Sequence, residues 1–87
     1  VELTSAVNIA LADGDVNTLF IVKYTDAAAI DFTLPAMVVG VWIDVHNDSG
    51  STNSIVVKDV DANIIVTLAV GSKKRIMVDS TGLESAL

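Results

Sequence analysis

The feature that most constrains the fold is the period-two alternation of apolar residues within residues 30–58. Every second residue is apolar up to Pro35, and the alternation resumes after Gly40 over residues 41–46. A polar loop at residues 47–53 then leads into a third apolar run. Because successive side chains of a β-strand point to opposite faces, alternation bounded by Pro, Gly and Asn/Asp/Ser clusters is typical of short strands. The segment therefore predicts several strands joined by turns.

The rest of the chain continues this pattern. Turn residues recur roughly every 8–12 positions, including Asp13-Gly14-Asp15 and residues 59–62, which is typical of a β-sandwich or barrel. The nearly continuous apolar run at residues 18–24 predicts a central strand buried on both faces. The only helical candidate, residues 82–87, is too short to be stable alone. We therefore predict an all-β fold, a small antiparallel β-sandwich or barrel of about seven to eight short strands.

Length and composition predict a single domain that associates with other chains. The 87 residues suffice for one hydrophobic core, so residues 1–87 are expected to form one domain. Cysteine is absent, which excludes a disulfide. Apolar residues make up 52% of the chain but aromatic residues only 5%, so aliphatic side chains exceed what a small core covers. We expect the surplus to face another copy of the chain or another protein.

The charge of the chain argues against nucleic acid as a partner. The formal net charge is -6, whereas binding to a phosphate backbone requires a basic stripe. The only basic cluster, Lys73-Lys74-Arg75, is interpreted as a device that discourages pairing at a strand edge, with a salt bridge to an acidic partner as the alternative. Apolar runs stop well short of the ~20 residues of a membrane-spanning helix, so no membrane partner is expected.

The residues that could support catalysis or metal binding are few. His46 is the only histidine and is interpreted as a structural hydrogen-bonding residue. The pairs Asp13/Asp15 and Asp59/Asp61 lie in predicted turns, where Asp side chains bond the local backbone. Both pairs begin a D-x-D-x-N pattern, but each lacks the Gly and the bidentate Glu of a calcium loop. We therefore predict no enzymatic activity, no catalytic residue, no cofactor and no metal site.

Trp42 is the aromatic residue with the most open role. It lies out of phase with the neighbouring aliphatic residues and shares a strand face with Asp44 and His46. One interpretation is partial burial against an adjacent strand. Another is an anchor at a subunit interface, where Trp is enriched. A third is sugar stacking together with Asn47 and Asn53, although a single aromatic residue makes a poor sugar platform.

The N-terminal segment is a second candidate for an interface. Residues 1–6 contain no turn residue, and Val1 and Leu3 are alternate apolar positions. An extended N-terminal arm of this kind can add a strand to a neighbouring sheet, with packing on its own domain as the alternative. The predicted interface residues are Val1, Glu2, Leu3, Thr4 and Trp42. A small residue at the start is also what remains after removal of an initiator Met, which would make the chain a complete small protein; a processing boundary is the alternative.

Residues 18–82 resemble the small β-domains of tailed-bacteriophage virions, which occur in head decoration proteins and in fibre modules. The matching pattern starts at Thr33-Leu34-Pro35 and Val39-Gly40, continues through Asn47 and Gly50, and ends in the turn at residues 59–63. The chain departs from the pattern at Leu83, where such domains often carry an aromatic residue after the last Thr-Gly.

This resemblance implies a structural role on the virion. The expected function is that of a capsid decoration, or cement, protein that lies on the capsid surface, binds the major capsid protein and stabilises the shell. Small decoration proteins of this type tend to occupy three-fold positions, which agrees with a homotrimer. The alternative is a trimeric tail-fibre or receptor-binding module that recognises host-surface glycans.

Overall fold

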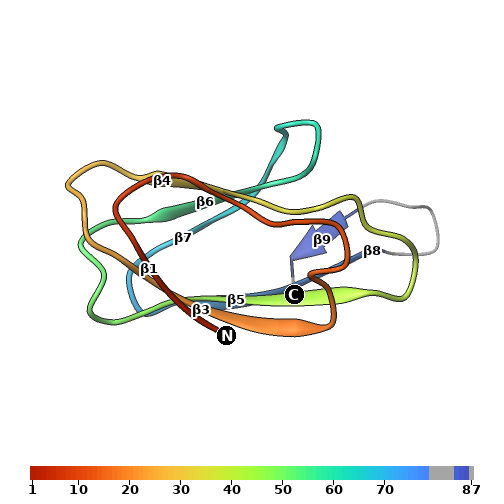
Figure 1. Ribbon diagram of the computed structural model, residues 1–87, viewed down its shortest axis with the longest axis horizontal. Helices are drawn as coiled ribbons and strands as arrows, with labels where there is room; N and C mark the ends of the chain where they lie inside the picture. Colours follow the sequence, from red (N-terminus) through yellow and green to blue (C-terminus); the bar gives the residue numbers. More distant parts are fainter. Residues whose placement is uncertain (79–83, 87) are drawn as a thin grey trace.

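The computed structural model describes residues 1–78 and 84–86, which form two packed β-sheets (Figure 1). The all-β sandwich predicted from the sequence is confirmed. Within this part of the chain, no helix is long and apolar enough to cross a membrane. The described residues form nine strands: β1 (Glu2–Ser5), β2 (Ile9–Ala10), β3 (Thr18–Tyr24), β4 (Ile30–Thr33), β5 (Trp42–Asn47), β6 (Ile55–Lys58), β7 (Ile64–Leu68), β8 (Lys73–Val78) and β9 (Glu84–Ala86).

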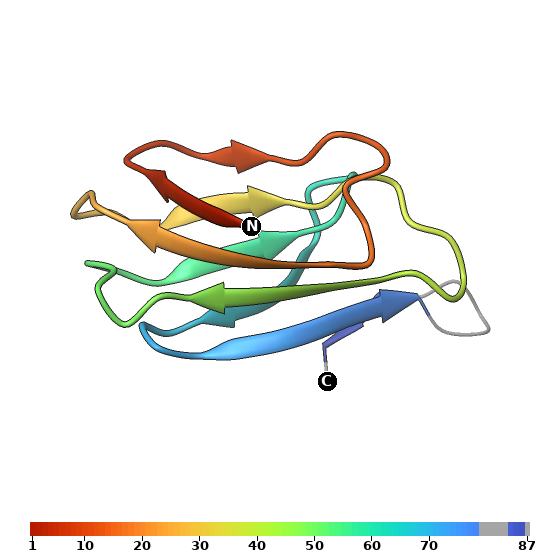
Figure 2. The same ribbon diagram turned by 60° about the horizontal axis from the view of Figure 1, so that its bottom comes forward.

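The chain alternates between the two sheets, and this alternation sets the strand directions. Sheet A has the order β1-β3-β5-β8-β9, and sheet B has the order β2-β4-β6-β7. From β1 to β6 each turn carries the chain from one sheet to the other, so that β1/β3, β3/β5, β2/β4 and β4/β6 are parallel pairs (Figure 2). The predicted antiparallel pairing holds only for β5/β8, β6/β7 and β8/β9.

The core lies between the sheets and follows the period-two pattern. Phe20 of β3 and Phe32 of β4 meet across the interface edge to face, with ring centroids 5.9 Å apart. The prediction that β3 is buried on both faces is wrong, because Leu19 is 38% exposed and Lys23 is also exposed. The buried core cluster consists of Phe20, Val22, Tyr24, Ile30, Phe32, Leu34, Ile43, Val45, Ile55, Val57, Leu68 and Ile76.

The segment predicted as an extended N-terminal arm folds onto its own domain. β1 runs parallel to β3 with Glu2 opposite Ile21, and the amino group of Val1 donates a hydrogen bond to the carbonyl oxygen of Leu19 at 2.8 Å. Leu3 packs against the core. The predicted arm is therefore strand β1 of sheet A, because the side chain of Leu3 packs against the core of its own domain.

A buried polar pair ties the loops together at one end of the sandwich. Asn47, the last residue of β5, is fully buried, and its Nδ2 donates to the carbonyl oxygens of Asn53 and Leu68, each at 3.0 Å. The hydroxyl of Ser51 donates to the carbonyl oxygen of Val22 and accepts a hydrogen bond from the amide of Tyr24. Strands from both sheets and the loop after β5 are thereby held in one arrangement.

Candidate binding face on sheet A

The outer face of sheet A collects the polar side chains of three neighbouring strands. In the strand register, His46 lies between Ile21 and Lys73. Asp44 lies in the next row, between Leu19 of β3 and Arg75 of β8. We call this surface the sheet A face, and it comprises Glu2, Thr4, Leu19, Ile21, Lys23, Trp42, Asp44, His46, Lys73, Arg75 and Met77.

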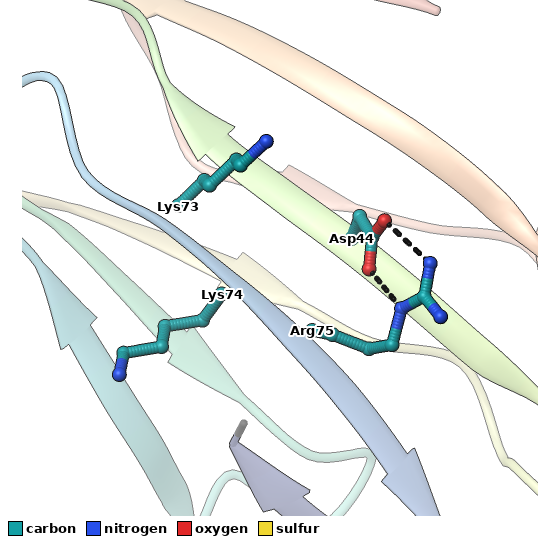
Figure 3. Close-up of a pocket in the computed structure, with 4 residues that line it drawn as sticks. All are labelled: Asp44, Lys73, Lys74 and Arg75. Atoms are coloured by element: carbon teal, nitrogen blue, oxygen red, sulfur yellow. Dashed lines mark hydrogen bonds and ion pairs between the residues drawn. The ribbon is translucent and has the colours of Figure 1, made fainter.

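Arg75 is held in place on this face by two neighbours. Its Nε donates to Asp44 Oδ1 at 2.7 Å and its Nη2 donates to Asp44 Oδ2 at 3.0 Å, which is the bidentate geometry of an arginine–carboxylate pair (Figure 3). The guanidinium carbon lies 4.3 Å from the centre of the Trp42 ring, in a cation–π contact. The hydrogen bonds that Arg75 donates to Asp44 raise the pKa of Arg75, so its guanidinium stays charged. The side chain nevertheless stays 47% exposed.

This arrangement suits contact with another macromolecule. Trp and Arg are enriched among the residues that dominate binding energy at protein interfaces. A guanidinium fixed by a carboxylate and a ring has little side-chain entropy left to lose on binding. Because Arg75 covers one face of the Trp42 ring, that face is closed to a sugar. The geometry thus favours a partner that contacts the fixed guanidinium of Arg75 beside the Trp42 ring.

The sheet A face is also the more basic part of an acidic molecule. It carries Lys23, Lys73 and Arg75, three of the five Lys and Arg residues of the chain, against the acids Glu2 and Asp44. The described pairing of β9 with β8 covers only Ile76–Val78, so the interpretation of the cluster at residues 73–75 as edge protection stays a prediction. Lys73 and Arg75 lie on the same face of sheet A as Asp44, whereas Lys74 extends from the other face of the strand (Figure 3).

The structure brings some of the sequence-predicted residues together and separates others. Trp42 lies on sheet A as predicted, and Val1, Glu2, Leu3 and Thr4 lie in or next to β1 at the edge of the same sheet. Their role at an interface stays a prediction.

The sugar-binding set of Trp42, Asn47 and Asn53 is not brought together. Asn47 is buried with its Nδ2 committed to the interior, and Asn53 donates to the carbonyl oxygen of Ala27. Trp42 stands at the opposite end of β5 from Asn47. Sequence reasoning also missed Arg75 as the partner of Trp42, because the pairing of β5 with β8 leaves no local signal.

The two D-x-D-x-N segments are turns, as predicted. Asp15 accepts a hydrogen bond from the amide of Ala12 at 2.9 Å. Asp59 Oδ1 accepts the amides of Asp61 and Asn63 at 2.9 and 2.8 Å. Among the residues that the structure describes, no group of three or more His, Asp or Glu side chains is placed to hold a metal ion.

The Asp59 turn is expected to loosen in acid. The backbone hydrogen bond from Asn63, with further bonds from its side chain and from the Asp61 amide, lowers the pKa of Asp59. Stabilisation by this carboxylate is present above the ordinary Asp pKa of about 3.9 and is lost as the pH falls through the lowered value. We expect the NMR amide signals of Asp61 and Asn63 to shift together at a pH below the ordinary Asp pKa. A shift centred at or above the ordinary pKa, or a shift that persists in Asp59→Asn, would show that the Asp59 carboxylate does not hold the turn.

Comparison with protein-family models, with curated proteins and with solved structures finds no match to this chain.

Proposed function

We propose that this protein is a structural component of a bacteriophage virion that decorates the capsid surface and stabilises the shell. The observation that carries the proposal is the exposed Arg75, which is fixed between Asp44 and Trp42 on the sheet A face. The resemblance of residues 18–82 to virion β-domains supports the same class of function. The partners in this proposal are further copies of the chain, in a homotrimer, and the major capsid protein.

The mechanism is binding without chemistry. Apolar area removed from water contributes about 25 cal/mol per Å2 before the costs of association. The sheet A face offers such area at Trp42, Leu19 and Ile21, with Arg75 as a charged anchor. A decorating trimer contacts a repeating lattice at several points at once, and these linked contacts multiply the apparent affinity. Bridging adjacent capsid subunits in this way resists their separation.

The proposal predicts that Trp42→Ala and Arg75→Lys weaken capsid binding. Lysine keeps the charge but loses the bidentate contact with Asp44, so a loss of about tenfold in affinity is expected for Arg75→Lys. A larger loss is expected for Trp42→Ala, because the apolar anchor and the support of Arg75 disappear together. The measurement is co-sedimentation of the purified protein with empty heads assembled from the major capsid protein of the same phage.

The matched control is Thr67→Ala, an exposed strand residue of sheet B on the other side of the sandwich. Its head binding should equal that of the parent protein. Equal binding by all variants would show that the sheet A face does not contact the capsid. If the parent protein does not bind heads but adsorbs to host cells, decoration is replaced by the alternative function. The protein is then a trimeric fibre or receptor-binding module for host-surface glycans.

A further inference from the structure

The turn between β6 and β7 projects from the sandwich as a rigid acidic knob, defined here as residues 59–63 (Figure 1). Asp59 fixes the turn by accepting the amides of Asp61 and Asn63, and Ala62 adopts a left-handed φ of 66°. Val60 at the tip is 57% exposed. The knob therefore presents an apolar side chain flanked by carboxylates in a fixed conformation.

A basic hollow of about 240 Å3 lies on the opposite side of the molecule, lined by Asp44, Lys73, Lys74 and Arg75 (Figure 3). The carboxylate of Asp44 is already paired with Arg75. Neither Lys73 nor Lys74 forms an ion pair with the residues that the structure describes. The hollow is smaller than the roughly 300–1,000 Å3 of small-molecule pockets, so it suits a few protruding side chains.

The knob and the hollow lie far apart within one copy. Lys73 begins β8 directly after the β7–β8 turn, whereas the knob precedes β7, so the length of β7 separates the two ends. They also belong to different sheets. A knob therefore cannot enter the hollow of its own chain, but it can enter the hollow of the next one. Contacts of this head-to-tail kind close into rings or continue as filaments.

We infer that the acidic knob of one copy docks into the basic hollow of a second copy. The occupant is chosen by charge complementarity: an Asp-Val-Asp tip meets Lys73 and Arg75, which share one face of sheet A, on a chain with a formal net charge of -6. Val60 loses its exposed surface in the contact. This inference rests on the proposed function, in which the protein is a homotrimer. It specifies the two surfaces through which the copies associate, and three such contacts close one ring.

A charge exchange between the knob and the hollow tests the contact. Asp61→Lys alters the knob without touching Asp59, which holds the turn, and Lys73→Glu alters the hollow. Each variant alone should associate at least about tenfold more weakly than the parent, since attraction becomes repulsion. The double variant Asp61→Lys/Lys73→Glu should regain assembly, because each altered knob then meets the altered hollow of the next copy. Analytical ultracentrifugation measures assembly, and circular dichroism confirms the fold.

The matched control is Asp13→Lys, which makes the same charge change in the other D-x-D-x-N turn at the same end of the sandwich. It should assemble as the parent does. A parent protein that stays monomeric at concentrations on the order of 100 micromolar, single variants that assemble normally, or a double variant that fails to recover would each overturn the inference. Head binding by an oligomer that is insensitive to these changes would leave the proposed function standing without this interface.

Discussion

Replacing Asn47 by alanine is expected to lower the free energy of unfolding by about 2–4 kcal/mol. The Asn47 side chain is fully buried and donates to the carbonyl oxygens of Asn53 and Leu68. Alanine would leave both acceptors without this donor, and a buried polar group that loses its partner costs about 1–3 kcal/mol. The Oδ1 atom of Asn47 is buried and accepts no hydrogen bond within the described residues. Alanine removes this unsatisfied acceptor as well, which limits the expected loss of stability.

Thermal unfolding measures this effect directly. A domain of this size loses about 4–8 °C in Tm per kcal/mol, so Asn47→Ala should melt roughly 10–25 °C below the parent. The control is Asn8→Ala, an exposed asparagine that accepts a single hydrogen bond from the amide of Asp31. Its Tm should fall by only a few degrees. Similar losses for the two variants would show that Asn47 does not tie the loops together.

The second large effect is expected at Phe32, where alanine should lower the free energy of unfolding by about 3–5 kcal/mol. Phe32 is fully buried between the sheets, and its ring meets Phe20 edge to face at 5.9 Å. Because neighbouring side chains relax only partly, the substitution leaves a cavity in addition to the lost burial. Thr33→Ala, on the outward side of the same strand, should change stability by less than about 1 kcal/mol.

A double-mutant cycle isolates the contact between the two rings. Denaturant unfolding of Phe32→Leu, Phe20→Leu and the double variant should give a coupling of about 0.5–1.5 kcal/mol for the aromatic pair. Leucine is used in the cycle because it keeps most of the apolar volume. Strict additivity of the two single changes would show that the geometry of the Phe20–Phe32 pair adds nothing beyond burial.

The sequence by itself determined the strands, their turns and the faces of their side chains. Alternation over residues 41–46 placed Ile43 and Val45 inside and Trp42 outside, as the structure confirms. The Asp59 turn could also be predicted from the sequence, because an Asp side chain accepts hydrogen bonds from backbone amides a few residues away. These features depend on the period of a β-strand and on contacts between near neighbours, and both are encoded locally.

Strand pairing was decided only by the tertiary structure. Turns of similar composition can close a hairpin or carry the chain to a second sheet, so the four parallel pairs had no separate signal. The burial of Asn47 depended on where the loop after β5 and the end of β7 came to lie. Asp44 and Arg75 are 31 residues apart and meet only because β8 pairs with β5. The binding face is thus a product of long-range packing, whose energy depends on contacts that a one-dimensional pattern does not contain.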